Sequence, residues 1–121
     1  MDNELWATIK KEITELLLKE PDLANYLSKR ILAHGDLASA MSALLSGKLA
    51  AEDMPAQTLK AVFDEALRTD LSIIETTTKD LLAIRERDPA VKSYSTAILY
   101  FKGFQALQAY RVAHWLWQQE R

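Results

Sequence analysis

Apolar side chains recur three or four positions apart along most of this chain, which is the spacing of one face of an α-helix. The pattern begins with Leu5, Ile9, Ile13 and Leu16, and similar runs continue almost to the last residue. Only three glycines and three prolines occur in 121 residues, and there are no cysteines. The sequence therefore predicts an all-α fold, a compact multi-helix domain of about six to eight helices that needs no disulfide.

Residues that favour helix ends divide this pattern into segments. Proline suits the start of a helix, and short polar side chains cap free backbone N–H groups there. We expect such starts at Asp2 or Asn3, Asp36, Pro55 and Asp70, while Pro21 either breaks the first helix or begins the next. Glycine favours helix ends, so we expect Gly35 to adopt left-handed backbone after the helix of residues 22–33. We also expect Gly47 to end the third helix.

Asp88 is the carboxylate in the least ordinary position. It stands between Arg87 and Pro89, and a residue before proline is pushed out of the helical region, so the fifth helix should end here. One interpretation is a turn aspartate paired with the neighbouring arginine. The other is a rigidly held carboxylate that binds the ammonium or hydroxyl group of a substrate. The residues alone leave both open.

The end of the chain carries most of the aromatic side chains. After a polar linker, Lys92 to Thr96, we expect one bent helix or two short ones over residues 97–119, with any bend at Gly103. Its apolar and aromatic-ring side chains cover nearly all sides, and they include Leu107, Tyr110, Val112, His114, Trp115 and Trp117. Such a helix should be buried on several sides, so we expect another subunit or further polypeptide to cover it.

Several classes of function are disfavoured. The formal net charge is −2 with both signs interspersed, which argues against nucleic acid and anionic membranes as partners. No run of 18 apolar residues and no apolar leader occur, so the expected location is the cytoplasm. His34 and His114 stand in different elements with no cysteine, so no metal site is expected. Without a glycine-rich phosphate loop or a serine elbow, we expect no catalytic residue and no bound cofactor in this chain.

Many residues from Arg85 to Trp117 resemble the bacterial serine acetyltransferases. The segments that carry the resemblance are RDPAV at 87–91, YST at 94–96, LYFKGF at 99–104, ALQAYR at 106–111 and HWLW at 114–117. The Leu5-Trp6 start, the region of His34, the loop at Lys48 and the Met54-Pro55 pair fit as well. The resemblance covers the whole chain and is densest near its end.

The resemblance implies transfer of an acetyl group from acetyl-CoA to the hydroxyl of L-serine, the first step of cysteine biosynthesis. In this family a left-handed β-helix follows the helical domain and carries the catalytic histidine and the CoA groove. The helical domains join two trimers into a hexamer. They also supply one aspartate to the site that binds L-serine and the feedback inhibitor L-cysteine, and that aspartate matches Asp88.

By the same resemblance, residues 1–87 form a helical bundle, 88–96 the substrate-site turn and linker, and 97–121 the aromatic helix that leads to the β-helix. No hexapeptide repeat occurs before Arg121. We therefore expect this chain to be inactive by itself, and to lack the tail with which the family docks onto O-acetylserine sulfhydrylase. Two alternatives stay open: a purely structural association module without a ligand site, and an unrelated helical adaptor.

Overall fold

The computed structural model describes residues 2–120, with side chains from residue 4 onward. Its regular elements are α1 (Asp2–Lys19), a 3-10 turn (Pro21–Leu23), α2 (Ala24–Leu27), a π-helical turn (Ser28–Leu32), α3 (Leu37–Leu49), α4 (Ala56–Thr69), α5 (Leu71–Arg87), α6 (Tyr94–Tyr100) and α7 (Lys102–Gln118). The all-α prediction is confirmed for this region. The expected cap at Asp2 or Asn3 lies outside the described side chains.

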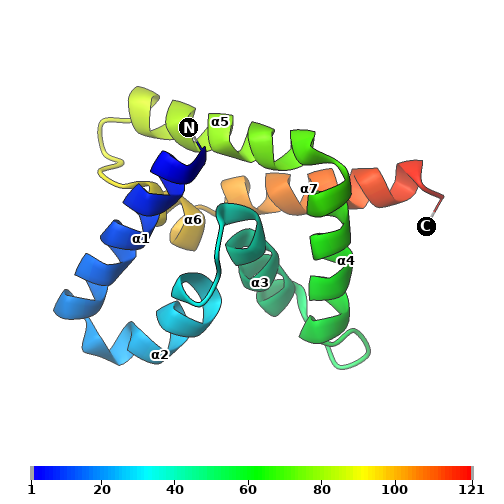
Figure 1. The fold of residues 1–121 in the computed structure, drawn as a ribbon, viewed down its shortest axis with the longest axis horizontal. Coiled ribbons are helices and arrows are strands. Elements are labelled where there is room, and N and C mark those ends of the chain that lie inside the picture. The colour runs from blue at the N-terminus through cyan, green and yellow to red at the C-terminus, as the bar shows by residue number, and fades with distance from the viewer. Residues whose placement is uncertain (1, 121) are drawn as a thin grey trace.

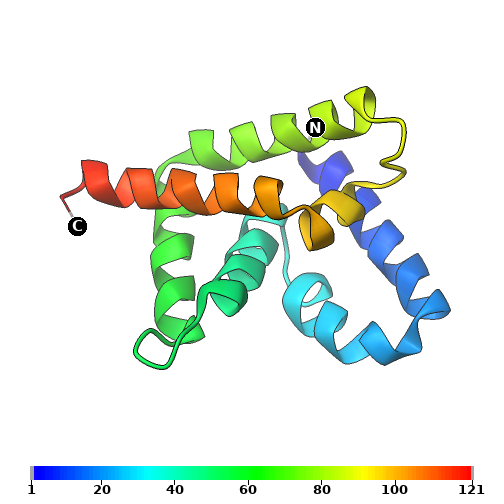
Figure 2. The ribbon, with the colours of Figure 1, turned by 180° about the vertical axis from the view of Figure 1, so that it is seen from behind.

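The helices form an open frame around a central one. In Figure 1, α5 and α7 lie side by side and run in opposite directions, while α1 and α4 run away from α5 on either side of α3. Seen from behind, α7 crosses in front of α4, and its last turns extend past that helix (Figure 2). None of the described helices is both long and apolar enough to cross a bilayer.

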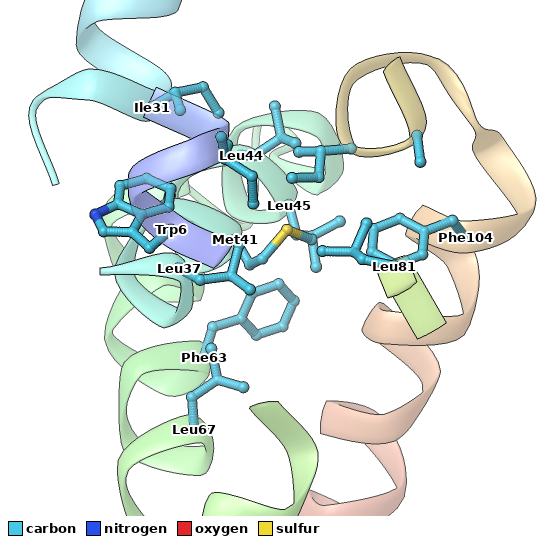
Figure 3. Close-up of a cluster of buried hydrophobic side chains, with 14 of the residues drawn as sticks. Trp6, Ile31, Leu37, Met41, Leu44, Leu45, Phe63, Leu67, Leu81 and Phe104 are labelled. Atoms are coloured by element: carbon cyan, nitrogen blue, oxygen red, sulfur yellow. The ribbon is translucent and has the colours of Figure 1, made fainter. Parts of the chain in front are cut away.

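The core is built around α3, most of whose residues are buried. Figure 3 shows its Met41, Leu44 and Leu45 beside Trp6, Phe63 and Phe104, which come from three other helices. The other buried α3 residues include Ala40, Ser42, Ala43 and Ser46. Small side chains such as these let neighbouring backbones come close, so α3 is covered on several sides. The last helix, α7, keeps Leu107, Tyr110 and Trp117 exposed, and its expected cover by another subunit or further polypeptide stays a prediction.

Two of the predicted helix starts are confirmed by their hydrogen bonds. The Asp36 carboxylate accepts the N–H of Ser39 at 2.8 Å, and the Asp70 carboxylate accepts the N–H of Ser72 at 3.1 Å. Pro21 begins a 3-10 turn, as expected for a proline at a first helical position. These caps are local, since donor and acceptor lie two or three residues apart in the chain.

Both predictions made for glycines are wrong. No described glycine has positive φ, so Gly35 is not left-handed. Gly47 does not end α3, which continues to Leu49. Instead, Gly47 leaves room for the guanidinium of Arg30, because an added Cβ would lie 2.6 Å from Arg30 Cζ. The Arg30 guanidinium donates to the carbonyl of Ala43, 3.4 Å away.

The last segment forms two helices, one of the two predicted alternatives, but its other details differ. The expected linker ends early, because Ser93 caps α6 by accepting the N–H of Thr96 at 3.3 Å. The chain then bends at Phe101, whose backbone is extended, and not at Gly103. Gln105 stabilises the bend at Phe101. Its Nε2 donates to two carbonyls near the end of α6, at 2.8 and 3.1 Å, which have no partner within their own helix.

Candidate functional site

Asp88 lies at the turn that ends α5. Its N–H donates to the carbonyl of Ile84 at 3.0 Å, and its backbone is extended at φ −112° and ψ 104°. Its Oδ1 accepts the N–H of Ala90 at 2.9 Å. The predicted helix end is confirmed. The hydrogen bond to Ala90 is that of a turn aspartate, but the arginine pairing that this interpretation included is wrong, since no ion pair within 4.0 Å reaches Asp88 from the described residues.

An open groove of about 820 Å³ adjoins this turn, between α5 and the start of α7. Its lining includes the apolar side chains of Ile84, Phe104 and Leu107 and the carboxylates of Asp80 and Asp88. Oδ2 of Asp88 has no hydrogen-bond partner among the described residues. Arg87 also lines the groove but makes no ion pair with Asp88 within 4.0 Å, so the groove combines an apolar wall with an exposed carboxylate that can bind a cation.

The second carboxylate of the groove is already engaged. Asp80 Oδ2 accepts from Arg111 Nη1 at 2.6 Å and from Gln108 Nε2 at 3.2 Å. The Oε1 of Gln108 in turn accepts from Arg111 at 2.9 Å and from the hydroxyl of Thr77 at 2.6 Å. Gln108 and Thr77 are buried. This network joins α5 to α7 and fixes the position of these two helices, which form the walls of the groove.

A contact between residues far apart in the sequence fixes the segment that follows the Asp88 turn. The carboxylate of Glu12, on α1, accepts the N–H of Ser95 at 3.0 Å and that of Tyr94 at 3.3 Å. These are free N–H groups in the first turn of α6, where a carboxylate is favoured. The turn of residues 88–93 is thus held between the end of α5 and an α6 that is attached to α1.

Sequence reasoning found Asp88 and missed its supports. No pattern in the sequence singles out Glu12, because the α6 N–H groups from which it accepts hydrogen bonds are 82 and 83 residues away. For the α5–α7 network a signal existed. Gln108 and Arg111 are polar side chains three residues apart in a largely apolar helix, which is the spacing of neighbours on one face.

The two histidines lie apart from the groove. Nδ1 of His34 is 2.9 Å from Ser39 Oγ near the start of α3. His114 is exposed on α7 and stacks on Tyr110, with ring centroids 5.9 Å apart. Within residues 2–120, no cluster of three or more potential metal-ligating side chains occurs. Neither histidine can act on a molecule held by Asp88 in this arrangement.

Comparisons with known proteins agree with one another. The family model for the serine acetyltransferase N-terminal region matches residues 5–109. The serine acetyltransferase of Haemophilus influenzae is 45% identical over 121 residues, which is all of this chain and 45% of that protein. The chain thus spans about half the length of the curated relatives it matches.

Solved structures show the same likeness. Serine acetyltransferase structures in complex with CoA and with cysteine are each 45% identical to this chain, with TM-scores of 0.95 and 0.96. Each match includes all of this chain, which corresponds to 52% of the chain in the CoA complex and 50% of the chain in the cysteine complex. Soybean serine acetyltransferase complexed with serine is 42% identical, with a TM-score of 0.95, over 99% of this chain and 49% of its own. The chain therefore belongs to the serine acetyltransferase family, whose N-terminal helical region it matches.

Proposed function

We propose that this chain is the helical part of an enzyme that transfers the acetyl group of acetyl-CoA to the hydroxyl of L-serine, and that Asp88 binds the ammonium group of serine. The observation that carries the proposal is the placement of Asp88. Its carboxylate lines a groove, is held by one backbone N–H and has no basic partner among the described residues. An ammonium ion supplies the missing positive charge and three hydrogen-bond donors.

The same ion pair accounts for L-cysteine as a second ligand. Serine and cysteine share their ammonium and carboxylate groups and differ in one side-chain atom, so a carboxylate that holds the ammonium does not distinguish them. We therefore propose that cysteine competes with serine at Asp88.

The proton of the serine hydroxyl must be removed by another group. Neither His34 nor His114 lines the groove, and its acidic residue besides Asp88 is bound by Arg111. We propose that the general base and the CoA-binding residues belong to a β-helical region outside this chain, and that residues 1–121 alone do not transfer acetyl groups. Adding serine and acetyl-CoA to the chain and following the release of CoA tests this.

A chimera tests the role of Asp88 directly. Residues 1–121 replace the corresponding region of the Haemophilus influenzae serine acetyltransferase, and Asp88→Asn is introduced. Loss of a charged hydrogen bond costs about 1.5–3 kcal/mol, which predicts roughly 10- to 150-fold weaker serine and cysteine binding. Asp70→Asn is the matched control, because Asp70 also accepts a backbone N–H two residues ahead at a helix boundary. Unchanged affinities in Asp88→Asn would refute the proposal.

A second role is supported by a separate observation. Leu107, Tyr110 and Trp117 on α7 are 43%, 62% and 71% exposed, more than an isolated small domain needs to leave uncovered. We propose that the helical domain also associates with copies of itself. Light scattering over a concentration series measures this, and a chain that stays monomeric throughout would contradict it. Docking onto O-acetylserine sulfhydrylase stays a proposal from the resemblance alone, to be tested by co-sedimentation.

A further inference from the structure

Arg85 lies close to Asp88 in the chain without pairing with its carboxylate. The two residues are three positions apart at the end of α5, which is the spacing at which the side chains of a helix are neighbours. Arg87 is nearer in sequence, but adjacent positions of a helix do not face each other. No ion pair within 4.0 Å joins Asp88 to any described residue. Whatever holds Arg85 away from Asp88 therefore bears on the substrate site.

The ring of Tyr94 accounts for the position of Arg85. The central carbon of the Arg85 guanidinium lies over this ring, 4.6 Å from its centroid. The face of an aromatic ring carries partial negative charge, so it attracts a guanidinium, whose flat shape also stacks on the ring. Among the described residues, no carboxylate forms an ion pair with Arg85. The cation best placed to pair with Asp88 is thus engaged with the first residue of α6.

Tyr94 is held in place independently of Arg85. Its N–H donates to the carboxylate of Glu12, on α1, at 3.3 Å. The hydroxyl of Ser93 caps the same helix by accepting the N–H of Thr96. Tyr94 is half-buried, whereas Arg85 is exposed. The ring is therefore a fixed surface on which the long side chain of the arginine rests.

Neither side chain belongs to the groove itself. The described residues that line the groove include Asp88, Ile84 and Phe104, and neither Arg85 nor Tyr94 is among them. A small molecule held by Asp88 in the groove therefore does not touch the Tyr94 ring. Any influence of this ring on the bound molecule passes through Arg85 and then through Asp88, so Tyr94 is a positioning residue.

The end of α5 offers a simpler reason for the presence of Arg85, but not for its contact with the ring. The free carbonyl groups in the last turn of a helix favour cations, and Arg85 and Arg87 both stand in the last turn of α5. That attraction requires a positive charge and no aromatic partner. It also leaves the guanidinium free to pair with Asp88. The stacking on Tyr94 is the observation that this simpler reason does not explain.

We propose that Tyr94 holds Arg85 away from Asp88 and so keeps this carboxylate free for the ammonium group of serine or cysteine. The inference rests on the function proposed above, because it requires Asp88 to bind that ammonium group. Arg85 and the ammonium group are both cations, so they compete for the same carboxylate. An exposed ion pair is weak, but without the ring it would occupy enough of Asp88 to weaken binding of both amino acids roughly 2- to 6-fold.

Steady-state kinetics of the chimeric enzyme described above tests this role. Tyr94→Leu removes the ring and should raise the KM for serine and the inhibition constant for cysteine about 2- to 6-fold, with the KM for acetyl-CoA and kcat unchanged. Tyr94→Phe keeps the ring and should match the unmodified chimera. Adding Arg85→Met to Tyr94→Leu removes the competing cation, so both amino-acid constants should return to their original values. A ring that only stabilises the fold predicts no such recovery, and a double variant as weak as Tyr94→Leu refutes the proposal.

Two further variants complete the experiment. Lys10→Met is the matched control, because Lys10 lies over the ring of Trp6, 5.9 Å from its centroid, and neither residue lines the groove. It should change neither amino-acid constant. Tyr94→Leu should add no further loss to Asp88→Asn, and an additional loss would show that the ring acts by another route. If Asp88→Asn weakens serine binding and Tyr94→Leu does not, only the role of Tyr94 is wrong; if Asp88→Asn has no effect, the function proposed for Asp88 fails as well.

Discussion

Removing the Glu12 carboxylate is expected to destabilise the fold far more than removing its neighbour on the same helix. Glu12 accepts two backbone N–H groups of α6, at 3.0 and 3.3 Å. A hydrogen bond to a charged group contributes about 1.5–3 kcal/mol when it is well protected. Glu12 is half-buried and one of its bonds is long, so the lower end applies. We expect Glu12→Ala to lower the free energy of unfolding by about 2 kcal/mol.

The assay is urea and thermal unfolding followed by circular dichroism, at a concentration where the chain is monomeric. For a domain of this size the predicted loss lowers the midpoint temperature by roughly 6–10 °C. Glu12→Gln should lower the midpoint temperature by less than Glu12→Ala does. The glutamine keeps one acceptor oxygen, while its amide N–H₂ group faces a backbone N–H donor. Glu15→Ala is the matched control, since Glu15 lies on the same helix and is exposed. Equal losses in Glu12→Ala and Glu15→Ala would show that the contact does not stabilise α6.

Two further predictions concern the α3–α4 side of the molecule. Gly47→Ala should stabilise α3 more in an Arg30→Ala background than in the unmodified chain, because the new methyl group displaces the guanidinium; equal gains in urea midpoint would contradict the contact. Burial raises the pKa of Asp64, but its hydrogen bond with Lys60 at 2.8 Å and nearby cations outweigh burial and hold the pKa below its usual 3.8. The ionised Asp64 therefore stabilises the fold above pH 3.8, and this stabilisation is lost as the pH falls through the lowered pKa. The difference in free energy of unfolding between the unmodified chain and Asp64→Asn should narrow from pH 7 to pH 3.

The predicted helix ends show how far local reasoning reaches. Asp36, Asp70 and Asp88 stand at helix ends as expected, because a cap or a residue before proline acts on atoms two to four positions away. The two glycines show where it stops. Gly47 lies inside a helix because Arg30, from another element, occupies the space beside it. The sequence alone does not distinguish a glycine that leaves room for a neighbouring side chain from a glycine that forms a turn.

The candidate site divides in the same way. Asp88 was found from its place before a proline, and the resemblance suggested its role. The groove beside it depends on the pairing of Asp80 with Arg111 across two helices. The spacing of Gln108 and Arg111 indicates a polar side of α7, but it does not identify Asp80 on α5 as the partner. The attachment of α6 to Glu12 is equally non-local. These contacts decide whether the Asp88 turn is held in one position.

The sequence by itself determined the helical class, the approximate helix limits and the family, because periodicity, capping and motif residues are properties of neighbouring positions. Only the tertiary structure decided which helix lies at the centre. Small residues let α3 approach its neighbours closely, whereas α7, richer in aromatic side chains, keeps Tyr110 and Trp117 exposed. Hydrophobicity measures the tendency of a side chain to leave water, while burial depends on the shapes of the surfaces available to cover it.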